Sequence, residues 1–345
     1  MGDIRKSVLE CIGNTPMVDI SRLCKKYGVE GRILVKLEMM NPGASKKDRI
    51  ALYMIEEAER KGLLKPGQTV VEETSGNTGN GLAVVCAVKG YPFVAAMSKG
   101  NSLERMQMMK GLGAELLLVD QLPTSPRGSV TGADLKKVEE AAIEFAEKNG
   151  AFLANQFYNP DNSKAHEKST AEEIWRQTDG QIDYFVDFVG TGGTYAGIAQ
   201  GLKTHNRNIK CFVVEPEKGG VYGGHTPCEN PIHVIQGGGY AVKRELVHEE
   251  NVDGSVLISD EECTQTTREL AAVEAIFGGF STGANVRAAI KLLQGEARGK
   301  TIVCLANDTG LKYLSTKLYQ YEINRERTDA AEIIKEAMKK KKGNC

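Results

Sequence analysis

Four short loops combine glycine with threonine, serine or asparagine in a pattern suited to anion binding. They are TSGNTGNG at 74–81, VGTGGTYAG at 189–197, FSTGAN at 280–285 and LANDTG at 305–310. The first two each lie between an apolar run typical of a strand and a pattern typical of a helix. Glycines let the backbone approach an anion, and a helix N-terminus adds unpaired N–H groups and the positive end of its dipole. The segment GTGGT is the best candidate for phosphate, although a tight turn without a ligand is the alternative reading.

Two adjacent lysines, Lys46 and Lys47, lie in NPGASKKDR at 41–49, just before a helical pattern. The positive potential at the start of a helix disfavours a charged lysine there and lowers the pKa of its amine. A lysine of that kind near an anion-binding loop is a suitable Schiff-base amine. Surface lysines are common, so either residue alone is also compatible with a structural role.

Several other kinds of site are absent from the sequence. It contains no GxxxxGK[ST], no complete GxGxxG and no HExxH motif. The histidines have no metal-ligand spacing, so we expect no metal site. The GxSxG match at 279–283 follows a helical pattern rather than the core strand that a hydrolase nucleophile requires. These absences leave the lysines and the glycine-rich loops as the candidate chemistry.

Charge and cysteine usage favour a cytoplasmic protein that binds neither nucleic acid nor membrane. The 345 residues include 44 Lys+Arg and 45 Asp+Glu, a net charge of −1, whereas nucleic acids and anionic membranes attract clustered positive charge. The eight cysteines form no CxxC pair, and several lie in apolar runs, as reduced buried thiols do. The first residues lack the apolar core of a signal peptide, and no apolar run is long enough to span a membrane.

Short apolar runs alternate with helical patterns along most of the chain, which predicts an α/β fold with mostly parallel sheet. The predicted strands are 33–37, 69–72, 93–97, 115–119, 184–188, 211–214, 256–258 and 302–305. Helical spacing of apolar residues is clearest in Ile50, Met54, Ile55 and Ala58. We expect an N-terminal domain over 1–155 and a larger C-terminal domain over 156–345. The irregular stretch 215–244 is long enough to be a lid or a dimer contact.

The order of these motifs resembles that of the cysteine synthase (O-acetylserine sulfhydrylase) and cystathionine β-synthase family. NPGASKKDR, TSGNTG, NQFYNP, GTGGT and the late DTG follow one another as in that family, and IGNTPMVDISRL at 12–23 resembles its N-terminus. The resemblance extends over about 12–321. It implies pyridoxal 5′-phosphate as the cofactor and the tryptophan-synthase β-like fold (fold type II), with two three-layer αβα domains.

The resemblance also implies a role for individual residues. The family pattern S-x-K places the Schiff base, and the catalytic base, on Lys47; only the spacing from Ser45 selects it over Lys46. Asn77 would hydrogen-bond the 3′-oxygen of the cofactor. The substrate carboxylate would be held by Thr74, Ser75, Asn77, Thr78 and Gln156. The phosphate would be cradled by Gly190, Thr191, Gly192, Gly193 and Thr194.

Thr309 corresponds, in this comparison, to the hydroxyl residue at the pyridine nitrogen. A neutral hydroxyl leaves the pyridine largely unprotonated, which favours β-elimination over reactions that need a long-lived carbanion. The neighbouring Asp308, if it faced the nitrogen instead, would weaken this argument. The reaction implied is β-replacement through an aminoacrylate, with O-acetyl-L-serine and sulfide giving L-cysteine and acetate.

Four departures from the family pattern make the substrate less certain than the cofactor. Asn101 replaces a methionine, 169–174 reads STAEEI, 281–284 reads STGA, and Tyr240 stands where a small residue is usual. Three other enzyme reactions therefore stay open: a cysteine lyase or desulfhydrase, a lanthionine- or cystathionine-type synthase releasing sulfide, and an amine-adding 2,3-diaminopropionate-type synthase. A non-catalytic binding protein is a further alternative. The expected partners are a second copy of the chain and a serine acetyltransferase tail.

Overall fold

The computed structural model describes residues 4–125, 130–228, 231–321, 323 and 329–342, and in these helices and strands alternate. The strands are β1 (Met17–Asp19), β2 (Arg32–Lys36), β3 (Val70–Glu73), β4 (Phe93–Ser98), β5 (Glu115–Val119), β6 (Phe152–Leu153), β7 (Tyr184–Phe188), β8 (Lys210–Pro216), β9 (Gly254–Ile258) and β10 (Thr301–Leu305). The helices are α1 (Ser21–Lys26), α2 (Lys47–Arg60), α3 (Asn77–Lys89), α4 (Leu103–Gly111), α5 (Gly132–Asn149), α6 (Asp161–Ala165), α7 (Glu172–Gln177), α8 (Gly193–His205), α9 (Asp260–Glu274), α10 (Phe280–Gln294) and α11 (Ala330–Lys342). Single turns are η1 (Val8–Cys11), η2 (Glu38–Met40), the π-helical η3 (His166–Ala171), η4 (Glu249–Asn251) and η5 (Gly310–Tyr313).

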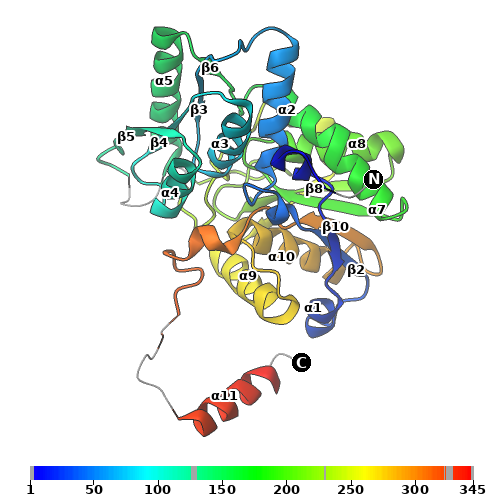
Figure 1. Ribbon diagram of the computed structural model, residues 1–345. Helices are drawn as coiled ribbons and strands as arrows, with labels where there is room; N and C mark the ends of the chain where they lie inside the picture. The colour runs from blue at the N-terminus through cyan, green and yellow to red at the C-terminus, as the bar shows by residue number, and fades with distance from the viewer. Residues whose placement is uncertain (1–3, 126–129, 229–230, 322, 324–328, 343–345) are drawn as a thin grey trace.

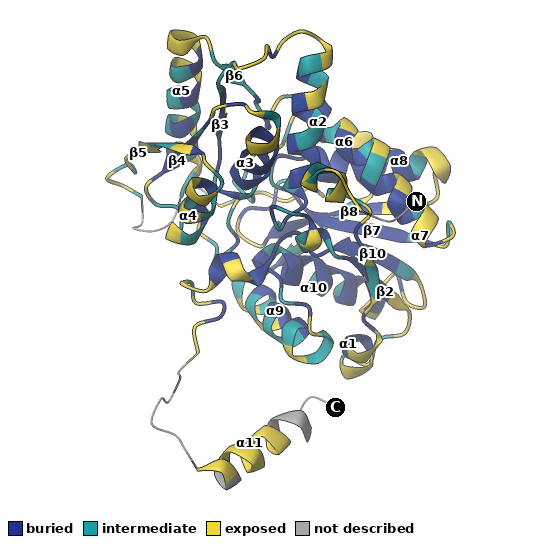
Figure 2. Cartoon of the chain, viewed as in Figure 1, coloured by how far each residue is buried: buried dark blue, intermediate teal, exposed yellow. Residues whose placement is uncertain are grey.

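The larger sheet has the strand order β1-β2-β10-β7-β8-β9, and every pair except β1–β2 is parallel. Figure 1 labels three of its strands, β2, β10 and β8. The two faces of this sheet are buried separately because successive side chains of a strand point to opposite sides. On β7, Val186 packs with residues of α1, α9 and α10, whereas Phe185 packs with residues of α7 and α8. This gives a three-layer unit with a buried sheet in the middle (Figure 2).

The smaller sheet is entirely parallel, in the order β5-β4-β3-β6. Val70 of β3 packs with residues of α2, α3 and α4, and its neighbour Val71 packs against α5. The two sheets and their covering helices confirm the predicted α/β class. Ile50, Met54, Ile55 and Ala58 are all buried on α2, the face that the helical spacing predicted.

All eight predicted strands are present within a few residues of their expected bounds. Sequence reading missed β1 and the two-residue β6, which are too short for a periodic pattern. A single boundary at residue 155 does not describe the sheets, because β1 and β2 belong to the larger sheet. Val35 of β2 pairs in parallel with Cys304 of β10, a contact between the two ends of the chain that periodicity cannot reveal.

Candidate active site

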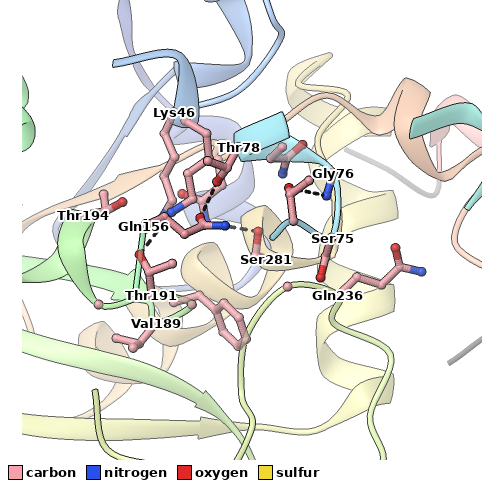
Figure 3. Close-up of a pocket in the computed structure, with 18 of the residues that line it drawn as sticks. Lys46, Ser75, Gly76, Thr78, Gln156, Val189, Thr191, Thr194, Gln236 and Ser281 are labelled. Atoms are coloured by element: carbon pink, nitrogen blue, oxygen red, sulfur yellow. Dashed lines mark hydrogen bonds between the residues drawn. The ribbon is translucent and has the colours of Figure 1, made fainter. Parts of the chain in front are cut away.

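All four glycine-rich loops reach one pocket. The loop after β3 contributes Thr74 to Thr78, and the loop after β7 contributes residues 189–192 and Thr194. Ser281 and Asn307 come from the other two loops. Figure 3 shows Thr191 and Thr194 on one side of the pocket and Ser75 and Gly76 on the other. The pocket therefore lies where strands end and helices begin, the usual position of ligand sites in parallel α/β sheets.

The loop from Gly190 to Thr194 has the properties of a phosphate cup. Helix α8 begins at Gly193 without a capping side chain, so N–H groups of its first turn are available to a ligand. Gly192 has φ 93°, a left-handed conformation that glycine adopts at no steric cost. A Cβ on Gly193 would lie 2.0 Å from Oδ1 of Asn162, a buried oxygen that has no hydrogen-bond partner among the described residues. The site therefore requires glycine for packing and offers N–H and hydroxyl donors to an anion.

The two adjacent lysines have different surroundings. The Lys46 amine is buried and forms an ion pair with Asp187 of β7 at 2.6 Å. The Lys47 amine donates to the Thr191 hydroxyl at 3.3 Å and has no carboxylate within ion-pair distance among the described residues. Burial and the positive charge of Lys46 lower the pKa of Lys47 to about 7. Lys47 is therefore the amine that is available beside the cup.

The loop after β3 presents polar groups opposite the cup. The Thr74 hydroxyl accepts hydrogen bonds from the N–H groups of Gly76 and Gly79, at 2.9 and 3.0 Å, which fixes the turn into α3. Thr78 hydrogen-bonds to the side chain of Gln156, and the two lie side by side in Figure 3. The structure thus places the expected carboxylate-binding residues Thr74, Ser75, Thr78 and Gln156 in the lining of the same pocket as the cup.

A buried carboxylate, Glu72, holds the segment that carries Gln156. Its oxygens accept hydrogen bonds from the N–H groups of Asn155 and Gln156, at 2.7 and 3.2 Å. Burial raises the pKa of Glu72 to about 8. Sequence reading did not identify this contact, because a strand residue and a loop 83 positions later carry no joint signal.

Asn77 lines the pocket, and its amide is held from both ends by residues near the C-terminus. Lys312 donates to its Oδ1 at 2.8 Å, and its Nδ2 donates to Asp308 at 2.8 Å. Asp308 also accepts from the Tyr313 hydroxyl at 2.7 Å. Asp308 is therefore engaged with Asn77 and Tyr313 and is not among the residues lining the pocket.

The structure does not place Thr309 where the resemblance implied. Thr309 is not among the lining residues, and its hydroxyl accepts from the N–H of Leu311 as the cap of η5. The hydroxyl that does line the pocket from this side belongs to Ser281, which accepts from Asn307 at 3.1 Å. The sequence placed Ser281 in the FSTGAN loop, in the GxSxG match and in a departure from the family pattern, and predicted no contact between it and the cofactor. That match begins α10 and follows α9, so it lacks the preceding strand of a hydrolase site.

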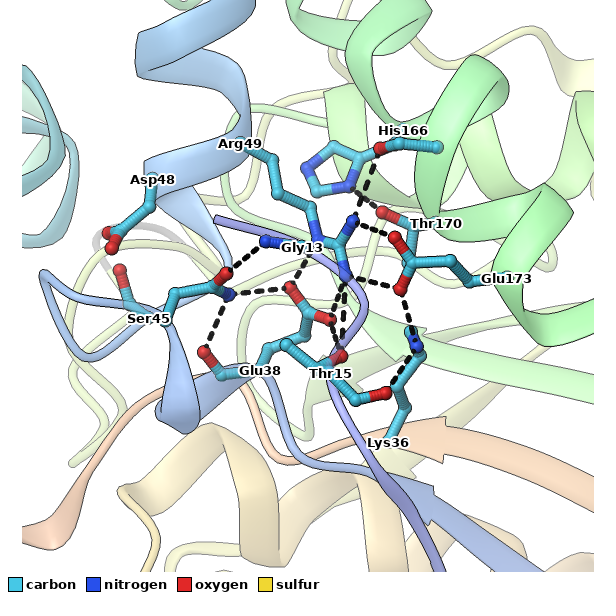
Figure 4. A network of polar contacts seen from close by, with 12 residues as sticks. Gly13, Thr15, Lys36, Glu38, Ser45, Asp48, Arg49, His166, Thr170 and Glu173 are labelled. Carbon is cyan, nitrogen blue, oxygen red and sulfur yellow. Dashed lines mark hydrogen bonds and ion pairs between the residues drawn. The ribbon is translucent and has the colours of Figure 1, made fainter. Parts of the chain in front are cut away.

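Two groups of buried polar contacts lie behind the cup. The Thr194 hydroxyl contacts Nε2 of His166 at 3.1 Å, and His166 Nδ1 contacts Thr170 at 2.8 Å. Nearby, the Arg49 guanidinium pairs with Glu38 and Glu173, each at 2.7 Å (Figure 4). The network ties α2, α7 and the chain before β1 together behind the cup. His166 is thus a buried residue with hydrogen-bonded partners at both ring nitrogens.

Two of the four departures from the family pattern lie in the pocket. Tyr240 and Ser281 line it, whereas Asn101 and the segment 169–174 do not. Tyr240 comes from the irregular segment 215–244, which also contributes Gln236 and Gly237. Gly237 lies so close that a Cβ on Gly190 would be 2.6 Å from its carbonyl oxygen. This segment therefore forms the wall next to the cup.

Neither a metal site nor a membrane span is present in the residues that the structure describes. No group of three or more His, Cys, Asp or Glu side chains is arranged to hold a metal ion in that part of the chain. None of its helices is both long and apolar enough to cross a bilayer.

A buried amine beside a glycine-rich anion cup, at the edge of parallel sheets, defines the class: enzymes that hold a phosphorylated aldehyde cofactor. The family model of pyridoxal-phosphate dependent enzymes matches residues 8–308, and the chain belongs to this family. A cysteine synthase of Staphylococcus aureus (strain Mu50 / ATCC 700699) is 40% identical over 317 residues, covering 92% of this chain and 97% of that protein.

The chain also superposes on solved enzyme structures. A cysteine synthase from Entamoeba histolytica superposes with a TM-score of 0.84 at 38% identity, covering 93% of this chain and 92% of that chain. A hydrogen sulfide-producing enzyme from Fusobacterium nucleatum gives 0.82 at 39% identity, covering 90% and 100%. An O-ureido-L-serine synthase gives 0.84 at 35% identity, covering 96% and 99%.

The protein uses pyridoxal 5′-phosphate, and its residues fit this cofactor. The uncapped start of α8 and the hydroxyls of Thr191 and Thr194 suit the phosphate. The Lys47 amine, which lacks a counterion within ion-pair distance in the described chain, suits the aldehyde. The fold is the type II fold expected from the resemblance.

Proposed function

We propose that this protein is a cysteine synthase, converting O-acetyl-L-serine and hydrogen sulfide into L-cysteine and acetic acid. The observation that carries the proposal is the Lys47 amine. It lies 3.3 Å from Thr191 of the cup, with a pKa lowered to about 7 and no carboxylate within ion-pair distance in the described residues. An amine with that pKa is neutral in a large fraction at physiological pH, as a nucleophile and a base must be.

Each wall of the pocket has a distinct task in this reaction. The residues Gly190, Thr191, Gly192, Gly193 and Thr194 hold the phosphate. Thr74, Ser75, Thr78 and Gln156 bind the substrate carboxylate, which orients the amino acid along the wall opposite the cup. Asn77 holds the 3′-oxygen through the amide hydrogen that Asp308 does not use. Ser281 provides the neutral hydroxyl at the ring nitrogen that had been assigned to Thr309.

Bound pyridoxal phosphate supplies the electron-withdrawing group that weakens the Cα–H bond of the substrate. Lys47 then takes up the α-proton, and its position beside Thr191 keeps the amine next to the cup while it does so. Acetate leaves with the bonding electron pair of the Cβ–O bond. Hydrosulfide forms the new Cβ–S bond, and Lys47 returns the proton to Cα.

The test compares two lysine variants of the purified protein. We expect Lys47→Ala to lose both the visible absorption of the bound cofactor and cysteine formation from O-acetyl-L-serine and sulfide. Lys46→Met is the matched control and should keep the visible absorption, although its loss of the ion pair with Asp187 lowers stability. Normal absorption and turnover in Lys47→Ala would contradict the proposal.

A second candidate function is supported by Tyr240, which makes this wall bulkier than in the family pattern. A different wall favours a different second substrate, such as a thiol amino acid in a lanthionine- or cystathionine-type reaction. The Fusobacterium nucleatum neighbour is described as producing hydrogen sulfide. If the protein released sulfide from L-cysteine and did not turn over O-acetyl-L-serine, the result would favour a cysteine lyase or a lanthionine- or cystathionine-type synthase. Incorporation of an added amine would favour the 2,3-diaminopropionate-type reaction.

We propose that the protein acts as a homodimer in the cytoplasm and that its pocket accepts the C-terminal tail of a serine acetyltransferase. Reduced, buried cysteines such as Cys86, Cys211 and Cys304 are compatible with the cytoplasmic location. We also propose 1–155 and 156–345 as the two domains, with β1 and β2 of the first range added to the sheet of the second. Light scattering tests the dimer, and capture of the holoenzyme by the tail peptide, reversed by O-acetyl-L-serine, tests the partner.

A further inference from the structure

Arg244 is a half-buried cation for which the described residues provide no counterion. Within the described residues no carboxylate lies within ion-pair distance of its side chain. Its guanidinium carbon lies instead over two aromatic rings, 5.0 Å from the centroid of Phe157 and 5.3 Å from that of Tyr240. Burial lowers the pKa of Arg244 below its usual value. By contrast, the buried Arg49 is neutralised by two carboxylates.

This guanidinium is at the edge of the active-site pocket. Both rings that it covers, Phe157 and Tyr240, are lining residues. On the other side, a Cβ on Gly192 of the cup would come within 3.0 Å of the Arg244 Cβ. The backbone N–H of Arg244 donates to the Tyr222 hydroxyl at 2.9 Å, which anchors the segment at this point. Arg244 is therefore held next to the pocket at two points, its backbone N–H and its guanidinium.

The other charges around the pocket do not balance Arg244. Asp187 is already paired with Lys46. Glu73 is the carboxylate whose charge acts on Arg244, but it is not within ion-pair distance, and burial with the neighbouring Glu72 raises the pKa of Glu73 to about 9. Burial therefore favours the neutral form of Glu73. A planar guanidinium that is desolvated and unpaired favours an external carboxylate, which it can bind through two parallel hydrogen bonds.

We propose that Arg244, stacked on Phe157 and Tyr240, binds a carboxylate at the far end of a substrate in this pocket. The carboxylate belongs either to the thiol that attacks Cβ or to the acyl group that leaves from it. The inference rests on the proposed β-replacement and names its substrate class. For the thiol, R–SH and O-acetyl-L-serine give an S-substituted L-cysteine and acetic acid, with the Cβ–S bond replacing the Cβ–O bond. Tyr240, where relatives of the resembled family have a small residue, provides one of the two rings.

Two pairs of compounds that differ only in the carboxylate test the two sources. Calorimetric titration of the holoenzyme with S-(2-carboxyethyl)-L-cysteine and with S-propyl-L-cysteine tests the thiol side. The kcat/KM values for O-succinyl-L-serine and O-butanoyl-L-serine, each with sulfide, test the leaving group. We expect the carboxylate to improve binding or kcat/KM by about tenfold or more in one pair, the scale of a charge-assisted hydrogen bond.

Arg244→Gln should abolish that preference and leave the neutral member of the pair unchanged, whereas Arg244→Lys should keep part of it. Lys243→Gln is the matched control, because it removes the neighbouring charge of a residue that pairs with Glu249 at 2.6 Å on the surface. The inference would be overturned if, in the unmodified protein, the two members of each pair had equal affinity or equal kcat/KM. A preference for the carboxylate that survives Arg244→Gln would overturn it as well. Failure to turn over any serine ester would instead contradict the proposed function, and the calorimetric arm would still test Arg244.

Discussion

Lys312 donates a hydrogen bond to Oδ1 of Asn77 over 2.8 Å, across 235 positions of the chain. Its amine is fully buried, and it also donates to the carbonyl oxygen of Gly43 at 2.9 Å. It therefore connects three segments: the one before α2, the start of α3 and the turn η5. Burial lowers the pKa of Lys312 to about 8, although the carboxylates of Asp308 and Asp48 favour its charge. Asn77 is thus oriented toward the pocket by a lysine that does not line it.

Lys312→Met should weaken cofactor binding and lower the free energy of unfolding. The change removes the buried amine that donates to Asn77 Oδ1 and to the carbonyl oxygen of Gly43, and loss of a hydrogen bond from a charged group costs about 1.5–3 kcal/mol. Urea unfolding and titration of the apo-protein with pyridoxal phosphate measure the two effects. Lys317→Met is the control, because Lys317 lies a few residues after η5 and is exposed. Similar results for the two variants would show that Asn77 does not need Lys312.

The rate at which the apo-protein takes up pyridoxal phosphate should rise with pH and level off above about 7. Only the neutral amine attacks an aldehyde, and the pKa of Lys47 is lowered to about 7 from an ordinary value of 10.5. As pH increases through this value the fraction of neutral amine approaches one, so the rate no longer changes. Stopped-flow absorbance records the profile. A rate that keeps rising to pH 10 would mean that Lys47 titrates as an exposed lysine does.

Gly193→Ala should abolish cofactor binding while leaving the protein folded. The added Cβ would lie 2.0 Å from the Asn162 side chain, so the start of α8 must move and the cup loses its shape. Gly132→Ala is the matched control: Gly132 begins α5, and a Cβ there meets nothing within 4 Å. We expect the control to bind the cofactor normally and to be as stable as the parent or slightly more so. Equilibrium dialysis against pyridoxal phosphate and thermal unfolding distinguish the two.

Arg49→Leu should destabilise the protein by about 3–5 kcal/mol, because it leaves the buried carboxylates of Glu38 and Glu173 without their main cation. Arg60→Leu, at the other end of α2, removes an exposed arginine and should cost less than about 1 kcal/mol. Chemical unfolding at neutral pH compares them. A small effect of Arg49→Leu would show that Lys36 alone can neutralise the network.

The same network predicts how stability depends on acid. Burial by itself would raise the pKa of Glu38, but the ion pair with Arg49 outweighs it and lowers the pKa to about 2; the pKa of Glu173 is likewise about 2. Both pKa values lie below the ordinary value of 4.5, so this contribution to stability is complete above about pH 4.5. It is lost as pH falls toward 2. Arg49→Leu should flatten the decline in this range.

The sequence by itself determined the elements and the chemical groups. Periodicity located eight strands and the buried face of α2, because side-chain direction repeats every two or 3.6 residues regardless of what the element packs against. The four glycine-rich loops and the family resemblance identified the pocket, since glycine beside Thr or Ser at a strand end has a local physical meaning. Lys47 was chosen over Lys46 by spacing alone.

Only the tertiary structure decided which groups meet. It paired Lys46 with Asp187, engaged Thr309 as a cap while Ser281 lines the pocket, and joined β1 and β2 to the C-terminal sheet. It also placed Lys312 under Asn77 and left Arg244 without a counterion in the described chain. These relations depend on contacts between residues far apart in the chain. The size of the pKa shifts of Lys47, Glu72 and Lys312 depends on burial by residues far away in the chain, so it could not be predicted from a local pattern.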